Sequence, residues 1–538
     1  MKKVLYNGKV YLEKGHFAQA LLIEDGRIAA VGTDREILAA SDGAEKTDCR
    51  GMTVLPGFND AHLHIMEFGR NLFLPALHGC RSTDEIVSVC RAFMEAHPDR
   101  RSLVAVGWNE FGFTDGNSRL PDRHDADAVS ETVPVLLRRV CGHMGVANTV
   151  LLRKLGFLDG RRVQGGTVEL GEDGLPDGRL TEMALIEAEN ALPKATPEEL
   201  AAFLAEGMQY AVSHGITTVQ SNDAGTVAPP EDVFRALDIL YGQGKAPLRY
   251  VSQNGFWDIA SMKAFLDGPY AGKSLYGGML KYGPVKMFKD GSLGARSAML
   301  RGKYMDDPKA EGVERITDEE QLEMIRCAAK HGTQVVTHCI GDLAIEKTMR
   351  LYREANGGAE NLLRHSIIHF QITDPGIIEY MRENHLLINV QPAFLEYDIH
   401  ICDERVGKEL GSTSYCFRSA YEAGIHTSFS SDCPIEDCNP FCGIYCAVTR
   451  QDYDGKPEGG WNPQECVSLE DAIDMFTAES AYHEFAEQEK GRLKPGYLAD
   501  LTVIDRDVFS CSAADILKIE PVLTMVGGRT VFRKEALI

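Results

Sequence analysis

Short apolar runs of the kind found in β-strands alternate with longer amphipathic helical patterns along most of the chain. This alternation is typical of βαβ units around a parallel sheet. Eight parallel strands close a barrel, so the pattern predicts the α/β class and a (β/α)8 TIM-like barrel. The eight runs are residues 53–55 leading to His64, 215–220, 248–252, 285–288, 334–338, 366–369, 386–390 and 426–430.

Both ends of the chain show hairpin chemistry instead. Residues 4–6 are followed by Asn7-Gly8, residues 21–23 are soon followed by Asp25-Gly26, and short β-type runs recur at 499–505 and 524–532. Two short β-rich ends need a partner sheet, and the simplest partner is each other. We therefore expect a small β-sandwich domain from residues 1–54 plus 487–538, and a barrel over residues 55–486.

The gap between the first two barrel runs is far longer than one helix requires, and it contains its own strand-like runs at 103–106 and 133–137. A segment of this size favours a folded unit over a structureless loop. We expect an α/β insertion at about 70–205, after the first barrel strand, that acts as a lid or substrate domain.

Size and charge narrow the class of protein. The 538 residues exceed the roughly 250–300 that one core usually holds. A net charge of −23 repels phosphate backbones and anionic lipids, so we expect no nucleic-acid or membrane partner. The charge says little about the substrate.

Neither a signal peptide nor a membrane span is evident. Asn7, Gly8 and Lys9 interrupt the first apolar run, and no later run approaches the ~20 apolar residues of a span. We therefore expect a cytoplasmic protein whose fourteen cysteines are reduced thiols. The densest set lacks the paired C-x2-C spacing of structural zinc modules, which disfavours a metal site there. It comprises Cys433, Cys438, Cys442 and Cys446.

The first chemical motif is Asp60-Ala61-His62-Leu63-His64, at the end of the first barrel run. Residues two apart on a strand point to the same face, so His62 and His64 can both reach one metal ion. Two histidines this close also occur by chance, so the pair alone does not decide the question.

Further ligand types stand at the carboxyl ends of other predicted strands, which converge on the mouth of a barrel. Lys286 lies in the fourth, His338 ends the fifth, His369 ends the sixth and Asp432 follows the eighth. Taken singly, each of these residues could have a structural role instead of binding a metal, as a core histidine or as a lysine paired with an acid. Together with the His-x-His pair they favour a metal centre of nitrogen and oxygen ligands, suited to zinc, iron or manganese.

With these residues in this order, the sequence resembles the amidohydrolase superfamily, and more closely the branch of N-substituted formamide deformylases (amidohydrolase family 3). The resemblance covers nearly the whole chain. Two departures are Cys141, where an acidic residue is expected before Gly-His, and Ser297, where threonine is more usual. The stretches that carry it are 55–64, 107–110, 141–143, 178–182, 285–292, 337–342, 390–392 and 431–434.

This resemblance implies a metal-dependent hydrolase that attacks a C–N bond (amide, formamide or N-acyl) of a small molecule with a metal-bridging hydroxide. It implies two divalent ions, with zinc expected and iron or manganese open, and a carbamylated Lys286 as their anionic bridge. His62, His64 and Asp432 would hold one ion, and His338 and His369 the other. Asp432 is also the candidate general base.

Further residues are candidates for substrate contact. His143 can donate to a developing oxyanion, Trp108 and Phe111 can form an apolar wall, and Arg296 can bind a carboxylate in a bidentate fork. The alternatives are a structural lid histidine, ordinary core packing and a structural ion pair.

Other functions stay open at this stage. The same centre can hydrolyse an ester, lactone or organophosphate, a single-metal deaminase would have no use for Lys286, and a catalytically silent binding scaffold would typically have lost ligands. The natural substrate and the oligomeric state are not readable, although related hydrolases often form homodimers.

Overall fold

The computed structural model describes residues 2–110, 113–114, 119–139 and 144–534. The chain divides into two compact units. Residues 1–69 with 200–538 form the barrel unit, and residues 70–199 form the insertion unit.

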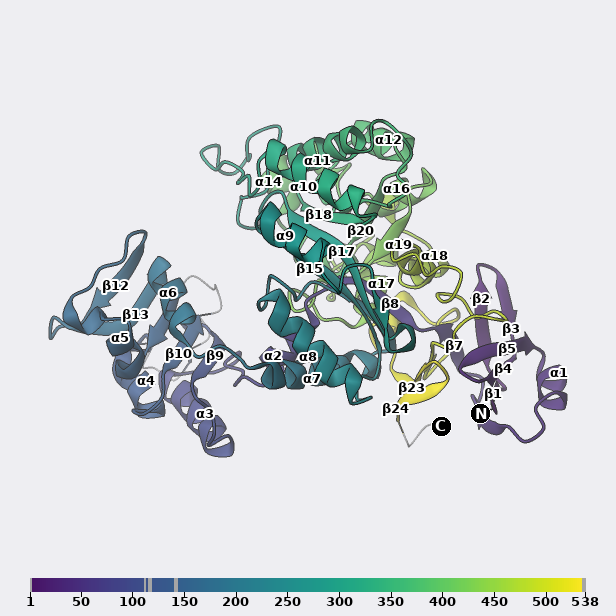
Figure 1. The fold of residues 1–538 in the computed structure, drawn as a ribbon, viewed down its shortest axis with the longest axis horizontal. Coiled ribbons are helices and arrows are strands. Elements are labelled where there is room, and N and C mark those ends of the chain that lie inside the picture. The colour runs from purple at the N-terminus through teal and green to yellow at the C-terminus, as the bar shows by residue number, and fades with distance from the viewer. Residues whose placement is uncertain (1, 111–112, 115–118, 140–143, 535–538) are drawn as a thin grey trace. The chain divides into compact units, whose positions relative to one another are not determined.

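Eight parallel strands form the centre of the barrel unit (Figure 1), which confirms the predicted (β/α)8 barrel. Neighbours along the sheet follow the order of the chain, because each strand returns to the sheet after an outer helix. The short β16 (Ser274–Leu275) pairs antiparallel with β17 at the start of that strand. The strands are β8 (Phe58–Leu63), β14 (Ile216–Ser221), β15 (Arg249–Gly255), β17 (Leu280–Phe288), β18 (Val335–Cys339), β19 (Ser366–His369), β20 (Leu387–Val390) and β21 (Thr427–Phe429).

The first and last strands of the barrel are joined just beyond their ends. The backbone N–H of Asp432 donates to the His62 carbonyl at 2.9 Å, and that of His64 donates to the Cys433 carbonyl at 2.7 Å. These bonds link the two end strands of the sheet at their carboxyl ends, and they bring the residues after β21 to the end of β8.

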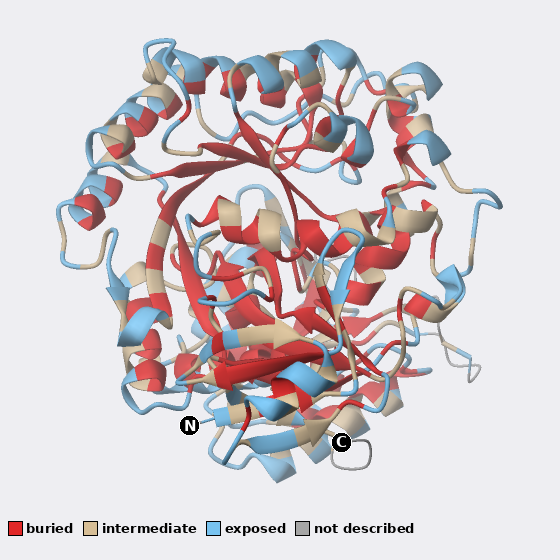
Figure 2. Cartoon of the chain, turned by 90° about the vertical axis from the view of Figure 1, so that its right-hand side faces the viewer, coloured by how far each residue is buried: buried red, intermediate tan, exposed pale blue. Residues whose placement is uncertain are grey.

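Amphipathic helices surround these strands, with buried residues on the inner side and exposed residues on the outer side (Figure 2). Helix α10 illustrates the local signals: Thr317 and Glu320 form a capping box at its start, and Met324 and Ile325 face the core. The main helices are α7 (Pro197–Ser213), α8 (Pro230–Gly242), α9 (Ile259–Leu266), α10 (Asp318–Lys330), α11 (Asp342–Ala355), α12 (Pro375–Glu383), α16 (Phe417–Glu422) and α17 (Pro440–Thr449).

Shorter helices occupy the loops and the ends of the barrel unit. Several follow β20, on the side where the strands end. They are α1 (Asp34–Ala39), α2 (Ile65–Leu72), α13 (Leu395–Asp398), α14 (Cys402–Val406), α15 (Lys408–Gly411), α18 (Leu469–Met475), α19 (Ala478–His483) and α20 (Ala513–Ile516).

Strands from both ends of the chain build two sheets over one shared core. A four-stranded sheet has the order β5-β4-β1-β6, and a six-stranded sheet has the order β24-β23-β22-β7-β2-β3. Leu21 and Ile23 of the first sheet share a buried cluster with Val54, Val503 and Leu523 of the second, which makes a β-sandwich. The strands are β1 (Lys2–Tyr6), β2 (Lys9–Glu13), β3 (His16–Ala18), β4 (Ala20–Glu24), β5 (Arg27–Gly32), β6 (Glu45–Asp48), β7 (Thr53–Pro56), β22 (Leu501–Ile504), β23 (Pro521–Val526) and β24 (Arg529–Arg533).

The position of the first barrel strand differs from the prediction. Residues 53–55 belong to β7, which pairs with β2 and β22 of the terminal sheet, and the barrel begins only at β8. Gly57 separates the two strands. A Cβ there would lie 2.2 Å from Cγ2 of Thr217, so only glycine fits where the chain crosses from one sheet to the other.

The insertion unit has its own sheet and helices, in agreement with the expected α/β insertion. Its five strands have the order β12-β13-β11-β10-β9. They are β9 (Leu103–Trp108), β10 (Val135–Arg139), β11 (Met144–Ala147), β12 (Gly166–Leu170) and β13 (Pro176–Glu182), with helices α3 (Thr83–Ala96), α4 (Arg123–Val129), α5 (Thr149–Lys154) and α6 (Met183–Ala191).

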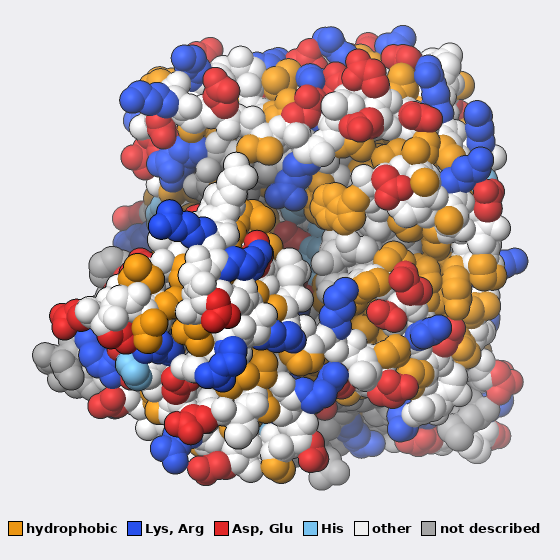
Figure 3. Space-filling view, turned by 60° about the vertical axis from the view of Figure 1, so that its left-hand side comes forward, with side chains coloured by type: hydrophobic (Ala, Val, Ile, Leu, Met, Phe, Trp, Pro, Cys, Tyr) orange, Lys and Arg blue, Asp and Glu red, His pale blue; other side chains and the backbone are white. Residues whose placement is uncertain are grey.

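Acidic and basic side chains are interspersed over the face shown in Figure 3. The cysteines of the described ranges are free thiols. Within the same ranges, no helix combines the length and apolar character that a membrane crossing requires.

A buried ion pair fastens the barrel to the terminal sheet. The guanidinium of Arg249 in β15 donates to Asp500 at 2.6 and 3.0 Å, and Asp500 also accepts from the backbone N–H of Gly527 at 2.7 Å. Both side chains are buried. Because neither charge has contact with bulk water, each depends on the other for its stabilisation.

We therefore expect Arg249→Met to lower the free energy of unfolding by about 3–5 kcal/mol, since it leaves a buried carboxylate without its partner. Urea titration followed by circular dichroism measures the change. Glu24→Gln, which breaks the exposed Lys2–Glu24 pair, is the control and should leave the midpoint unchanged. Equal midpoints for both variants would contradict this role of Arg249.

Candidate metal centre

His62 and His64 meet Asp432 where the first and eighth strands come together. Nε2 of each histidine lies 3.4 Å from Oδ1 of Asp432. The ligand atoms of the three residues all lie within 4.8 Å of one another. Three such atoms at this spacing can reach a single metal ion.

His338 and His369 stand beside this group at the ends of the fifth and sixth strands. Their ring centroids are 4.4 Å apart, and the His369 ring lies 5.8 Å from that of His62. His369 has a φ of 79°, a conformation that non-glycine residues adopt mostly where the surrounding structure holds them there. The four histidines therefore form one continuous group at the carboxyl end of the barrel.

Lys286 projects from β17 in the same part of the barrel. Its side chain is fully buried, and its Nζ has no hydrogen-bond partner among the described residues. Burial lowers the pKa of this amine to about 7, although the nearby Asp432 carboxylate acts in the opposite direction. A large share of Lys286 is therefore a neutral amine near neutral pH.

Each histidine uses one ring nitrogen to donate a hydrogen bond, so that in the neutral ring the other nitrogen carries a lone pair. Nδ1 is the donor in His62, His64 and His369, whereas in His338 the donor is Nε2. Such outer hydrogen bonds select the tautomer and orient the ring of metal-bound histidines. His62 donates to Gln253 Oε1 at 2.7 Å, and His64 donates to the Asn222 carbonyl at 2.6 Å. His369 donates to Gln391 Oε1 at 2.8 Å, and His338 donates to the Gly291 carbonyl at 3.0 Å.

The two glutamine amides are themselves held in one orientation. Nε2 of Gln253 donates to the Ala61 carbonyl at 2.9 Å, and Nε2 of Gln391 donates to Oγ of Ser430 at 2.9 Å. With the amide nitrogens committed in this way, the amide oxygens face the histidines. Sequence reasoning missed both roles, although Gln253 near the end of β15 and Gln391 just after β20 obey the same strand-end rule as the ligands.

Asp60 holds the segment that carries Asp432. Its carboxylate accepts hydrogen bonds from the Ser431 hydroxyl at 2.5 Å and from the Ser431 backbone N–H at 3.1 Å. Asp60 is buried, and burial raises its pKa to about 7. The motif that begins with Asp60 therefore contributes a positioning residue as well as two ligand candidates.

The protonation states suit a metal ion. Burial lowers the pKa of His338 to about 3 and holds those of His62 and His369 well below the usual value, so these rings are neutral. Oδ1 of Asp432, like Nζ of Lys286, is buried without a hydrogen-bond partner in the described ranges. Unpaired buried polar atoms cost free energy, and a divalent cation would remove that cost. The donor set fits the group that the resemblance implies.

The profile described as the amidohydrolase family matches residues 45–532. The chain belongs to the amidohydrolase family. Among its relatives is the protein YtcJ of Bacillus subtilis (strain 168), 29% identical over 99% of this chain and 100% of the relative. Another is the N-substituted formamide deformylase of Arthrobacter pascens, 26% identical over 95% of this chain and 94% of that enzyme. The predicted membership is confirmed.

A solved structure of an uncharacterized metal-dependent hydrolase from Pyrococcus horikoshii OT3 is also similar. It is 26% identical, covers 95% of this chain and 99% of its own, and has a TM-score of 0.80. Family, fold and the ligand set at the barrel mouth agree with one another. This amidohydrolase is therefore a metal-dependent hydrolase that uses a divalent metal.

The remaining predicted site residues have other placements. Trp108 is fully buried in the core of the insertion unit, where its indole N–H donates to the Leu137 carbonyl at 3.1 Å, which is the core packing left open above. Arg296 donates to Asp306 at 2.6 Å, which is the structural ion pair left open above. His143, Phe111 and Cys141 lie outside the described residues, and the role of His143 stays a prediction.

Ser297, the second departure from the family pattern, braces the loop after β17. Its hydroxyl accepts from the Ser292 N–H at 3.0 Å, and its carbonyl accepts from the Gly291 N–H at 3.1 Å. The Gly291 carbonyl in turn accepts from His338. Threonine offers the same hydroxyl, so this substitution keeps the loop contact.

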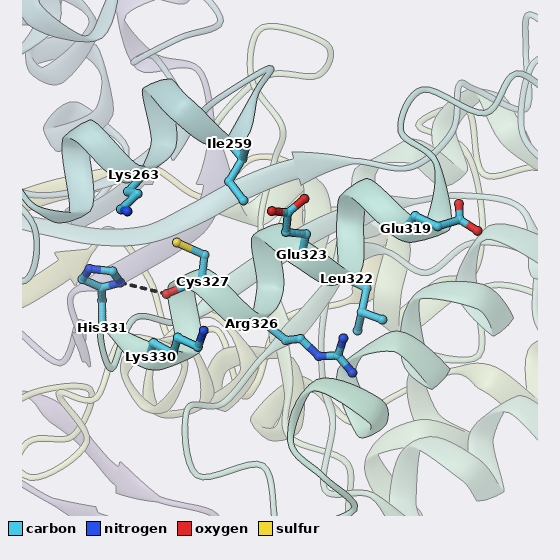
Figure 4. A pocket seen from close by; sticks show the side chains of 9 residues that line it. All are labelled: Ile259, Lys263, Glu319, Leu322, Glu323, Arg326, Cys327, Lys330 and His331. Carbon is cyan, nitrogen blue, oxygen red and sulfur yellow. Dashed lines mark hydrogen bonds between the residues drawn. The ribbon is translucent and has the colours of Figure 1, made fainter.

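A hollow on the outside of the barrel has no share in this centre. It lies between α9 and α10, and the side chains that line it include Lys263, Glu323 and Arg326 (Figure 4). His331 at its edge donates to the Cys327 carbonyl at 2.8 Å. None of the predicted metal ligands lines the hollow, so we assign it no part in the reaction.

We expect Gln253→Leu and Gln391→Leu each to weaken metal binding by about 10–100-fold, because each removes the acceptor that orients a histidine. Elemental analysis after dialysis against graded chelator concentrations measures this affinity. Gln253→Glu keeps an acceptor and should retain the metal, and the exposed Gln464→Leu is the control for loss of an amide. Full retention in both leucine variants would show that the rings need no outer acceptor.

Proposed function

We propose that this amidohydrolase cleaves a C–N bond, in an amide, formamide or N-acyl group of a small molecule, with two divalent ions and a carbamylated Lys286. The observation that carries the proposal is the buried Nζ of Lys286, which lies among the histidines without a hydrogen-bond partner in the described ranges. A neutral amine in that position can take up CO2 and become an anionic ligand. The likeness to N-substituted formamide deformylase supports the choice of a C–N bond.

The ligand positions support a division into two sites. His62, His64 and Asp432, whose ligand atoms converge, would hold one ion, and His338 with His369 would hold the other. The Lys286 carbamate would contribute an oxygen to each. Zinc is the proposed metal, with iron and manganese as alternatives that accept the same ligands. Divalent ions bound there supply water with a lowered pKa and polarise a carbonyl oxygen.

Asp432 is the proposed general base. It accepts the proton of the attacking water as the C–O bond forms and delivers it to the nitrogen as the C–N bond breaks, so the products are a carboxylic acid and an amine. The Asp60–Ser431 contacts hold the Asp432 segment during this transfer. The buried surroundings strengthen these contacts by excluding water.

Lys286→Ala tests the bridge. We expect the metal content to fall from two ions per chain to at most one, and turnover to fall by at least about a hundredfold, because loss of a ligand exceeds loss of an outer contact. Elemental analysis of protein purified without chelators measures the first effect. The exposed Lys330→Ala is the control. Unchanged metal content in Lys286→Ala would rule out the bridge, and one ion in both samples would favour a single-metal centre.

A panel of substrates tests which bond the enzyme cleaves. N-formyl and N-acetyl amines should be hydrolysed with release of the amine, which a fluorogenic amine reagent detects. Carboxylic esters, lactones and phosphotriesters of similar size form the comparison group. Faster turnover of that group would replace the amidase assignment, and no turnover of any compound by protein loaded with two ions would point to a binding scaffold.

A further inference from the structure

A large aromatic side chain stands exposed at the same end of the barrel as the metal centre. Trp257 follows β15 by two residues, and 65% of its surface is exposed. The carboxyl ends of the barrel strands carry the ligand set, so the loop of Trp257 belongs to the rim of that mouth. Single exposed apolar residues are common, and exposure alone therefore does not indicate a role.

What distinguishes Trp257 is its fixed orientation. The indole N–H donates to the Gly225 carbonyl at 3.0 Å. The backbone beneath is tightly packed: a Cβ on Gly225 would lie 2.0 Å from the Gly255 carbonyl oxygen, and the Gly255 N–H donates to the Ala224 carbonyl at 2.8 Å. The edge of the indole is thereby held in place while 65% of the side chain's surface stays open to solvent.

Phe288 connects this indole with the metal centre. The Trp257 and Phe288 rings are stacked, with centroids 5.5 Å apart and planes inclined by only 10°. On the inner side, Nζ of Lys286 lies 4.7 Å from the Phe288 centroid, and the His338 ring lies 5.6 Å from it. A continuous aromatic surface therefore leads from the proposed bridge to the rim.

We propose that Trp257, backed by Phe288, is a substrate-binding subsite for a flat, uncharged apolar group, such as an aromatic ring carried by the scissile amide. The inference rests on the proposed function for its choice of substrate. A planar ring can stack on a pre-oriented indole with little loss of side-chain entropy. Arg315, whose guanidinium carbon lies 6.0 Å from the Phe288 centroid, disfavours a cationic group here.

Two formamides that carry the same ring carbons in aromatic or saturated form test the specificity. The enzyme should turn over N-benzylformamide with a higher kcat/KM than N-(cyclohexylmethyl)formamide. Trp257→Ala should reduce this preference about tenfold, and Trp257→Phe should keep most of it, because a flat ring remains. The control is Tyr276→Ala, which removes another exposed aromatic residue before β17, at the opposite end of that strand. An unchanged preference in Trp257→Ala would overturn the subsite.

A binding experiment keeps the subsite testable without turnover. The probe is 4-nitrobenzyl alcohol, an uncharged nitroaromatic quencher of tryptophan emission. Trp108 and Trp461 are the other two of the three tryptophans. Saturable quenching should occur in the wild type and in Tyr276→Ala, and should disappear in Trp257→Phe. Saturable quenching of this kind with no amide hydrolysed would retain the subsite and reject the amidase. Quenching that is not saturable, or that is equal in Trp257→Phe, would reject the subsite.

Discussion

The junction between the first and last strands of the barrel is the interaction on which the site depends. Two backbone hydrogen bonds, from Asp432 to His62 and from His64 to Cys433, close the sheet at its carboxyl end. They also bring the Asp432 carboxylate beside the His-x-His pair, although Asp432 follows His62 by 370 positions in the chain. Its Oδ1 lies 3.4 Å from Nε2 of each of the two histidines. The contact that links the two ends of the sheet is thus the contact that brings the candidate ligands together.

Burial gives this assembly its chemical character. The barrel interior withholds water from Lys286 and from three of the histidines, which lowers their pKa values and favours their neutral forms. The N–H group of each imidazole ring still needs a hydrogen-bond acceptor. Gln253, Gln391 and two backbone carbonyls are these acceptors. The arrangement leaves lone pairs where a divalent ion can use them.

Much of the fold was predictable because strand periodicity and strand ends are local properties of the chain. The (β/α)8 barrel and the family followed from eight apolar runs and the ligand types at their ends. The error at residues 53–55 has the same origin: two strands separated only by Gly57 read as one run, and only sheet pairing assigns them to different sheets. Core packing and a substrate wall were both open for Trp108, because a buried core indole and a substrate wall look alike in sequence; its burial favours the first.

By itself the sequence determined which candidate ligands stand at the strand ends and in which order, since residue type and position are written in the chain. Tertiary structure alone decided which lone pairs are free, because that depends on acceptors such as Gln253, which lies 191 positions from His62. It also decided that Arg296 meets Asp306, and that Trp257 rather than Trp108 is exposed. Hydrogen-bond partners and exposure arise from packing between distant segments, for which no local pattern exists.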